Sequence, residues 1–129
     1  MRKVIKGKLR FANLGLETHE IETIAYFLDL GRTIEIIPAS HTPKMKQADF
    51  WMDGLIWEAK SPTVNTRRAL ERLFYRAAGQ SENIIMDLRR LKGDDVICLC
   101  VLEKAFRTTR RVRNFYIITK NGKLKKYKK

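Results

Sequence analysis

The dipeptide Asp53-Gly54, set between two short segments rich in aromatic and aliphatic residues, constrains the fold more than any other feature of this sequence. Both residues of the two-residue turn that joins adjacent strands need a positive φ, and Asp-Gly is among the dipeptides that meet this requirement best. If these residues form the turn, counting outwards places Asp49 directly opposite Glu58. The sequence therefore predicts a β-hairpin over residues 48–60.

Three charged side chains are expected at the open end of this hairpin. Cross-strand partners have Cβ atoms about 5 Å apart, and Lys60, two residues beyond Glu58, projects from the same face. The opposed carboxylates of Asp49 and Glu58 repel each other unless a cation lies between them or one of them is protonated. Lys60 can neutralise them in part. A divalent cation would do so more fully, and Lys60 could then orient or deprotonate a bound water. These groups are suited to breaking a phosphodiester.

The same residues resemble the signature of a nuclease superfamily. Asp49 followed by Glu58-Ala59-Lys60 is similar to the motif of PD-(D/E)XK nucleases, although Ala48 stands where that motif has its proline. The wider sequence resembles the C-terminal tRNA-cleaving toxin domains of contact-dependent growth inhibition (CdiA-type) proteins. The resemblance covers roughly residues 17–125, and its matching segments are residues 19–23, 57–62 and 80–90.

The order of the predicted elements is that of an α/β domain. The resemblance implies a PD-(D/E)XK-like αβββαβ core with a mixed central sheet flanked by helices, extended here by a C-terminal helix and β-hairpin. Residues 1–16 are expected to form a basic N-terminal arm, and residues 17–129 a single nuclease-like domain. Helices are predicted over residues 17–30, 66–78 and 94–107, and strands over residues 33–37, 83–88, 114–119 and 123–127.

Two of these predictions depend on local signals. Residues 96–102 have a strand-like composition, but the length of the segment, a possible N-cap at Asp94 and the basic residues at its far end favour a helix. Near the C-terminus, Asn121-Gly122 predicts a type I′ turn between the last two strands.

The charge balance indicates a polyanionic partner. The chain has 27 basic and 14 acidic residues and a formal net charge of +13. Such an excess favours nucleic acid. A membrane is not expected as partner, because no long apolar run and no basic amphipathic helix stands out. The N-terminus lacks the apolar segment of a secretory signal. Cys98 and Cys100 are too few and too close for a disulfide framework, which agrees with action in the cytosol.

Five residues outside the hairpin are predicted to contact nucleic acid. Arg67 and Arg68 begin a basic helix face beside the expected site, and Arg89 and Arg90 follow a strand as a basic edge. For the helix residues the alternative is a solvated basic face. Gln80 matches the Gln-Ser element of the resembled family, and its role would be a base or backbone contact.

The first predicted helix supplies two further candidates. Glu20 has two interpretations: a first-turn acid that interacts with the helix dipole, or, as the resemblance implies, an acid that acts on the metal or the water. His19 could contact phosphate or act as an acid–base group, and the alternative is an exposed histidine at a helix start.

The leading hypothesis is an endonuclease that cleaves RNA, with tRNA as the substrate that the resemblance implies. Asp49 and Glu58 would hold a divalent cation such as Mg²⁺, with the carbonyl of Ala59 as a further ligand. Lys60 would orient the attacking water or stabilise charge on the phosphate.

A metal-independent route is also open. In it the ribose 2′-OH attacks, and His19, Glu20 or Lys60 moves protons. The alternatives to an RNA-cleaving toxin are a DNA endonuclease of restriction or resolvase type on the same scaffold, and a non-catalytic basic module that binds nucleic acid.

A toxin of this kind would need an antagonist in the cell that makes it. By charge complementarity, we expect an acidic immunity protein that covers the basic cleft. The domain is expected to act in the bacterial cytoplasm, delivered there as part of a larger secreted protein.

Overall fold

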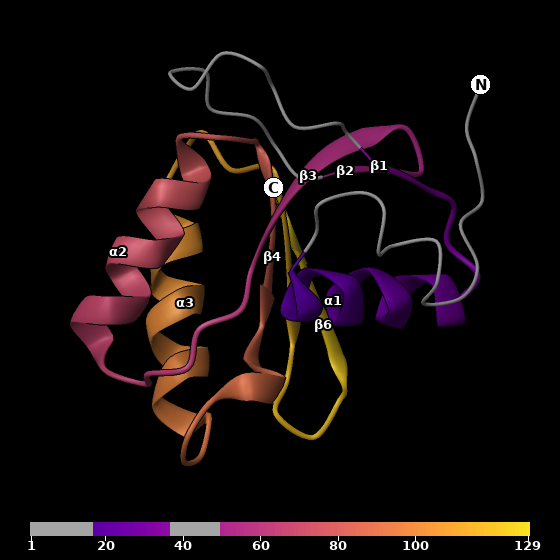
Figure 1. Ribbon diagram of the computed structural model, residues 1–129. Helices are drawn as coiled ribbons and strands as arrows, with labels where there is room; N and C mark the ends of the chain where they lie inside the picture. Colours follow the sequence, from indigo (N-terminus) through magenta and orange to yellow (C-terminus); the bar gives the residue numbers. More distant parts are fainter. Residues whose placement is uncertain (1–16, 37–49) are drawn as a thin grey trace.

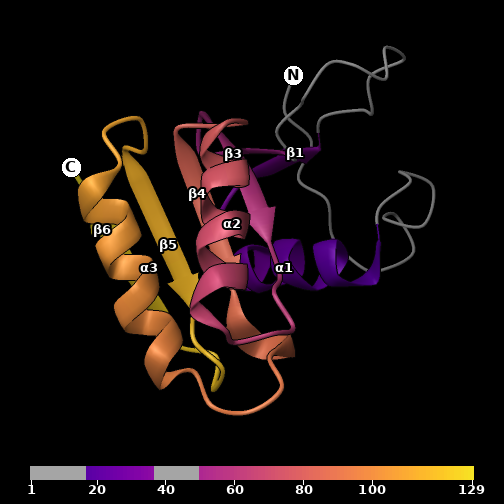
Figure 2. The same cartoon turned by 90° about the vertical axis from the view of Figure 1, so that its left-hand side faces the viewer.

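The computed structural model describes residues 17–36 and 50–129, which form a six-stranded mixed sheet with helices on both faces. In Figure 1, α2 and α3 pack side by side on one side of the sheet, and α1 lies on the other. Figure 2 looks onto the face that α2 and α3 cover. The elements in chain order are α1 (Thr18–Asp29), β1 (Ile34–Ile36), β2 (Phe50–Met52), β3 (Leu55–Lys60), α2 (Arg67–Ala78), β4 (Asn83–Asp87), the 3₁₀ helix Leu88–Arg90, α3 (Val96–Thr108), β5 (Asn114–Ile118) and β6 (Leu124–Lys128).

The strands lie in the sheet in the order in which they occur in the chain. β1, β2 and β3 are antiparallel neighbours, β3, β4 and β5 run parallel, and β6 returns antiparallel to β5. The two parallel steps are connected by α2 and α3, because a parallel connection must carry the chain back along the whole sheet. The predicted α/β class, with a helix and hairpin added after the fourth strand, is confirmed.

Two apolar cores hold the layers together. One lies between the sheet and α2 and α3 and includes Phe74 and Phe115, and the other lies between the sheet and α1 and includes Phe27 and Trp57. The central strand β4 is buried at all five positions, because successive side chains enter opposite cores. No helix in the described part of the chain is long and apolar enough to cross a membrane.

The hairpin that follows from Asp53-Gly54 is confirmed for the described residues. Asp53 has φ 50° and Gly54 φ 89°, as both positions of a type I′ turn require. The register pairs Phe50 with Trp57. Asp49, the predicted partner of Glu58, lies outside the described residues.

The prediction of a type I′ turn at Asn121-Gly122 is wrong. Ile118 pairs with Leu124, so the loop is one residue longer than that turn allows, and the Thr119 amide donates to the Lys123 carbonyl at 2.7 Å. Gly122 has φ 89°, whereas Asp53 is the one non-glycine residue with positive φ in the described ranges. The connection is therefore a three-residue loop with glycine at its left-handed position. The predicted helix over residues 94–107 is confirmed as α3, although its N-cap is Asp95.

Two glycines provide a matched test of backbone strain. A methyl group added at Gly122 would meet no atom within 4 Å, so Gly122→Ala isolates the cost of its left-handed φ. We expect a loss of about 1–2 kcal/mol in the free energy of unfolding, measured by urea denaturation. Gly79 has φ −75°, so Gly79→Ala should be neutral or slightly stabilising. Equal losses at the two positions would contradict this explanation.

Candidate active site

A pocket of about 480 Å³ lies between the N-terminus of α1, the end of β3 and α2. We call it the β3 pocket. Of the residues predicted from sequence, it contains His19, Glu20, Glu58, Lys60 and Arg90. The full lining is Glu17, His19, Glu20, Glu58, Ala59, Lys60, Ser61, Thr63, Leu73 and Arg90.

Glu58 and Lys60 form an ion pair within the β3 pocket. The distance from Lys60 Nζ to Glu58 Oε2 is 3.0 Å, and the Glu58 side chain is only 2% exposed. Their positions two residues apart on β3 place both on one face, as predicted. A buried carboxylate needs a cationic partner, and Lys60 provides one. Lys60 is the last residue of β3, beside Met86 of the parallel neighbour β4. In α/β sheets, ligands bind at the carboxyl ends of parallel strands.

The N-terminus of α1 supplies a second group of charged and polar side chains to the pocket. The Glu17 amide donates to Glu20 Oε1 at 2.9 Å, and His19 Nδ1 lies 3.3 Å from Glu17 Oε2. Glu20 therefore has a capping role as well as a place in the pocket. Sequence reasoning assigned no site role to Glu17, because glutamate is not among the residue types that mark a helix N-cap. Ser61 and Thr63 were also missed, although both follow Lys60 closely.

The donor atoms of the described residues suit a divalent cation. Glu17, His19 and Glu20 each offer an atom within 4.8 Å of the others, and Glu58 lines the same pocket. Carboxylate oxygens and an imidazole nitrogen are common ligands of such ions. The predicted ligand Asp49 lies outside the described residues.

The neighbouring residues Arg89 and Arg90 have different environments. Arg89 donates to both carboxylate oxygens of Asp87 at 2.9 and 2.7 Å and to the carbonyl of Glu22 at 3.0 Å. Its guanidinium also lies over the Tyr26 ring at 5.1 Å. The hydrogen bonds to Asp87 raise the pKa of Arg89 despite its partial burial. Arg90 is exposed and lines the β3 pocket. Of the two, only Arg90 has its side chain in the β3 pocket lining.

The contacts of Arg89 belong to a cluster that fixes α1 on the sheet. Asp87 is 3% exposed, and its Oδ2 also accepts a hydrogen bond of 2.7 Å from the Thr23 hydroxyl. Thr23 lies one helical turn after His19 and Glu20. The cluster of Thr23, Asp87 and Arg89 therefore sets the position of the α1 residues in the pocket.

The structure does not bring the other three predicted residues into the β3 pocket. Arg67 lies 3.6 Å from Glu71 and lines a separate small hollow with Cys100 and Lys104. Arg68 is exposed in the first turn of α2. Gln80 follows the C-terminal end of α2, at the end of the sheet where β4 begins.

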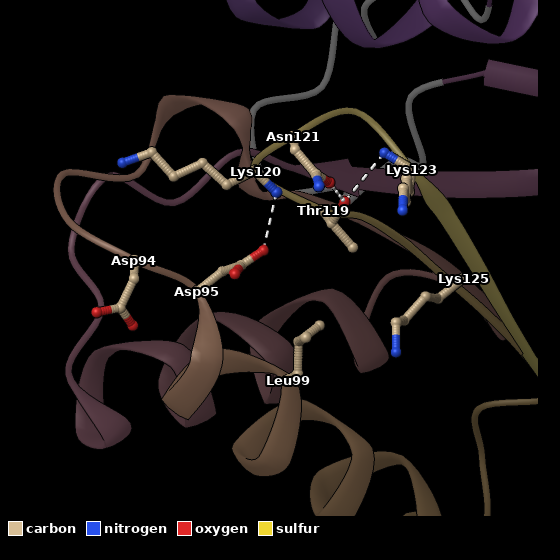
Figure 3. Close-up of a pocket in the computed structure, with 8 residues that line it drawn as sticks. All are labelled: Asp94, Asp95, Leu99, Thr119, Lys120, Asn121, Lys123 and Lys125. Carbon is tan, nitrogen blue, oxygen red and sulfur yellow. Dashed lines mark hydrogen bonds between the residues drawn. The ribbon is translucent and has the colours of Figure 1, made fainter.

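A further hollow of about 470 Å³ lies where the N-terminus of α3 faces the β5–β6 loop (Figure 3). The Lys120 amide donates to Asp95 Oδ2 at 2.9 Å, and the Lys123 amide donates to Thr119 Oγ1 at 3.0 Å. The first bond holds the loop against the start of α3, and the second closes the loop itself. The hollow contains none of the predicted site residues; its lining is Asp94, Asp95, Leu99, Thr119, Lys120, Asn121, Lys123 and Lys125.

Comparison with known proteins identifies the family to which this fold and site belong. A search of curated proteins found no match. Among solved structures, the chain is similar to a CdiA-CT/CdiI toxin and immunity complex from Burkholderia pseudomallei, with a TM-score of 0.67 and 15% sequence identity over 97% of this chain and 91% of that chain. At this identity the likeness concerns the fold. Residues 46–124 match the family model of the contact-dependent growth inhibition CdiA C-terminal domain. Because that match covers more than half of the chain, the protein belongs to the family of CdiA C-terminal domains of contact-dependent growth inhibition.

Proposed function

We propose that this domain is a toxin endonuclease that cleaves RNA, with tRNA as its substrate. The observation that carries the proposal is the ion pair between the buried Glu58 carboxylate and Lys60, in a pocket that also contains His19 and Glu20. A net charge of +13 supports a nucleic-acid substrate. Family membership supports the role of toxin. In this proposal the domain reaches the cytoplasm of a target bacterium as part of a larger protein.

The residues of the β3 pocket divide the chemistry among them. Arg90 contacts a phosphate at the pocket rim, where its planar guanidinium suits phosphate oxygens. Glu58 holds Lys60 in place, and Lys60 stabilises negative charge on the reacting phosphate or orients the attacking water. Glu58 and Asp49, the latter assigned from sequence alone, would hold a divalent cation. Such a cation, when bound, would polarise the phosphate and make a bound water more acidic.

A second route suits RNA in particular. The ribose 2′-OH attacks the adjacent phosphorus, the bond to the 5′-oxygen breaks, and a 2′,3′-cyclic phosphate forms. Glu20 or His19 accepts the proton of the attacking hydroxyl, and another of the pocket's acid–base groups protonates the leaving oxygen. The RNA ends distinguish the two routes, because hydrolysis leaves no cyclic phosphate.

The direct test is incubation of the domain with total RNA and with plasmid DNA, with and without EDTA, followed by sequencing of the RNA ends. We expect cleavage of tRNA at defined positions and no cleavage by Lys60→Ala. Loss of cleavage in EDTA would support the metal route. Cleavage of plasmid alone would indicate a DNA endonuclease, and binding without cleavage of either would indicate a non-catalytic module.

Glu20→Gln separates capping from chemistry. Glutamine can still accept the hydrogen bond from the Glu17 amide, so the free energy of unfolding should change by less than about 0.5 kcal/mol. The carboxylate is lost, so tRNA cleavage should fall by about 100-fold, measured as an initial rate. Glu22→Gln is the control, because it makes the same charge change on α1 outside the pocket. Equal rates for the two variants would remove Glu20 from the mechanism.

The proposed partner of the toxin is an acidic immunity protein that covers the β3 pocket and the basic surface around it. The similar solved structure is itself described as a complex of a toxin with its immunity protein. Complementary charge would make association with a basic toxin fast and sensitive to salt.

A further inference from the structure

A second, smaller hollow adjoins the β3 pocket. It has a volume of about 290 Å³ and lies between α2 and the segment that joins β3 to α2. We call it the α2 hollow. It shares Ser61, Thr63 and Leu73 with the β3 pocket. A nucleic acid with one phosphate in the β3 pocket would therefore run past the α2 hollow. The full lining is Ser61, Pro62, Thr63, Val64, Ala69, Arg72, Leu73 and Arg76.

The α2 hollow combines an apolar floor with a basic rim. Pro62, Ala69 and Leu73 contribute apolar surface, and Val64 leaves 51% of its own surface exposed. Arg72 and Arg76 are both exposed. This pairing of an apolar recess with cations matches a nucleotide, which has a flat apolar base and an anionic phosphate.

Three arginines of α2 form a stripe along one side of the helix. Arg68, Arg72 and Arg76 follow one another at intervals of four residues, so they neighbour each other on one side of the helix. Like charges at this spacing destabilise a helix. Arg67 pairs with Glu71, but no acidic side chain of the described residues forms an ion pair with this stripe. The stripe is therefore suited to a row of phosphates.

We infer that the α2 hollow binds the base of one unpaired nucleotide next to the cleaved phosphate, with Arg72 and Arg76 on neighbouring phosphates. The inference rests on the proposed nuclease function and names its substrate more closely. A volume of about 290 Å³ is near the lower end of the range for small-ligand pockets, about 300–1,000 Å³. A base can enter such a space only after leaving its stack and its pair. The domain therefore selects single-stranded loops over helical stems.

The test uses the full chain carrying Lys60→Ala, so that RNA is bound without being cut. The probes are an RNA hairpin carrying the fluorescent base 2-aminopurine at one loop position at a time, and a fully paired duplex of the same length. We expect one loop position to change its fluorescence on binding, because that base exchanges its neighbours in the loop for the protein. The duplex should give no such change.

Filling the hollow should remove this signal. Ala69→Leu places a larger side chain in the recess and keeps a good helix former on α2. It should abolish the fluorescence change and weaken hairpin binding by about 10-fold, since the contact of one base with the protein is lost. Affinity for the duplex should stay the same. Val64→Asp changes an exposed position, so it serves as the second variant should Ala69→Leu fail to fold.

A separate pair of variants measures how much the positive charge of the α2 arginines contributes to RNA binding. Arg76→Gln should weaken hairpin binding more than Arg110→Gln, which removes an exposed arginine between α3 and β5, at the far end of the sheet. Constant fluorescence at every loop position, together with unchanged hairpin affinity for Ala69→Leu and Val64→Asp, would overturn the inference. Cleavage by the wild-type domain would persist in that case. Fluorescence changes from a wild-type domain that cuts nothing would instead overturn the nuclease and leave the nucleotide site standing.

Discussion

Glu58→Gln is expected to lower the rate of tRNA cleavage by about 100- to 1,000-fold. Glutamine has nearly the same shape as glutamate but carries no charge, so it holds neither Lys60 nor a divalent cation in the β3 pocket. Because the wild-type carboxylate is 2% exposed and only 3.0 Å from Lys60 Nζ, solvent cannot replace what is lost. The measurement is the initial rate at saturating tRNA, with circular dichroism to show that the variant is folded.

The matched control for this variant is Glu82→Gln. Glu82 is 70% exposed, and its partner Arg113 lies 3.7 Å away, near the edge of the sheet where β4 and β5 begin. We expect its cleavage rate to equal that of the wild type. Residues that act as a unit lose activity non-additively, so Glu58→Gln combined with Lys60→Ala should be little worse than either alone. A folded Glu58→Gln variant with full activity would show that the ion pair is structural.

The largest effect on stability is expected from Arg89→Ala, which should lower the free energy of unfolding by about 3 kcal/mol. The change leaves the 3% exposed carboxylate of Asp87 without its ionic partner, and a buried charge without a partner is costly. It also removes the contacts to Glu22 and Tyr26. Urea denaturation of the variant measures the loss.

A second substitution tests whether the loss of stability comes from the unpaired charge of Asp87. Asp87→Asn removes the carboxylate charge that Arg89→Ala leaves unpaired. The double variant should therefore recover part of the stability lost in Arg89→Ala, although Asp87→Asn alone is destabilising. Arg113→Ala is the control, because its exposed ion pair with Glu82 should contribute less than about 1 kcal/mol. A double variant no more stable than Arg89→Ala would assign the loss to packing instead of charge.

The parts of the fold predicted well are those that depend on local chemistry. The turn at Asp53-Gly54 follows from backbone φ values that few dipeptides can adopt. Glu58 and Lys60 meet because strand alternation alone puts them on one face. The same reasoning failed at Asn121-Gly122, where the hydrogen bonds between Thr119 and Lys123 close a longer loop. Asn-Gly predicts a two-residue turn as Asp-Gly does, but the residues that flank it here form a three-residue loop instead.

The remaining site predictions depended on the direction in which each side chain points, which the sequence pattern does not give. Arg89 and Arg90 look equivalent in the chain, but Arg89 turns toward Asp87 and the carbonyl of Glu22, whereas Arg90 is exposed and lines the β3 pocket. Gln80 was predicted from a resemblance, and the length of α2 carries it away from the β3 pocket. The α2 hollow could not be predicted, since it forms only where Val64 and α2 come together.

The β3 pocket takes one wall from α1 and another from β3, which are separate layers of the fold. In the proposed nuclease, a chain whose sheet has formed but whose first helix has not yet docked would lack the groups that α1 brings to the pocket. The proposed nuclease should therefore be inactive until α1 docks, and in refolding experiments its activity should return with the burial of Trp57 and not before it.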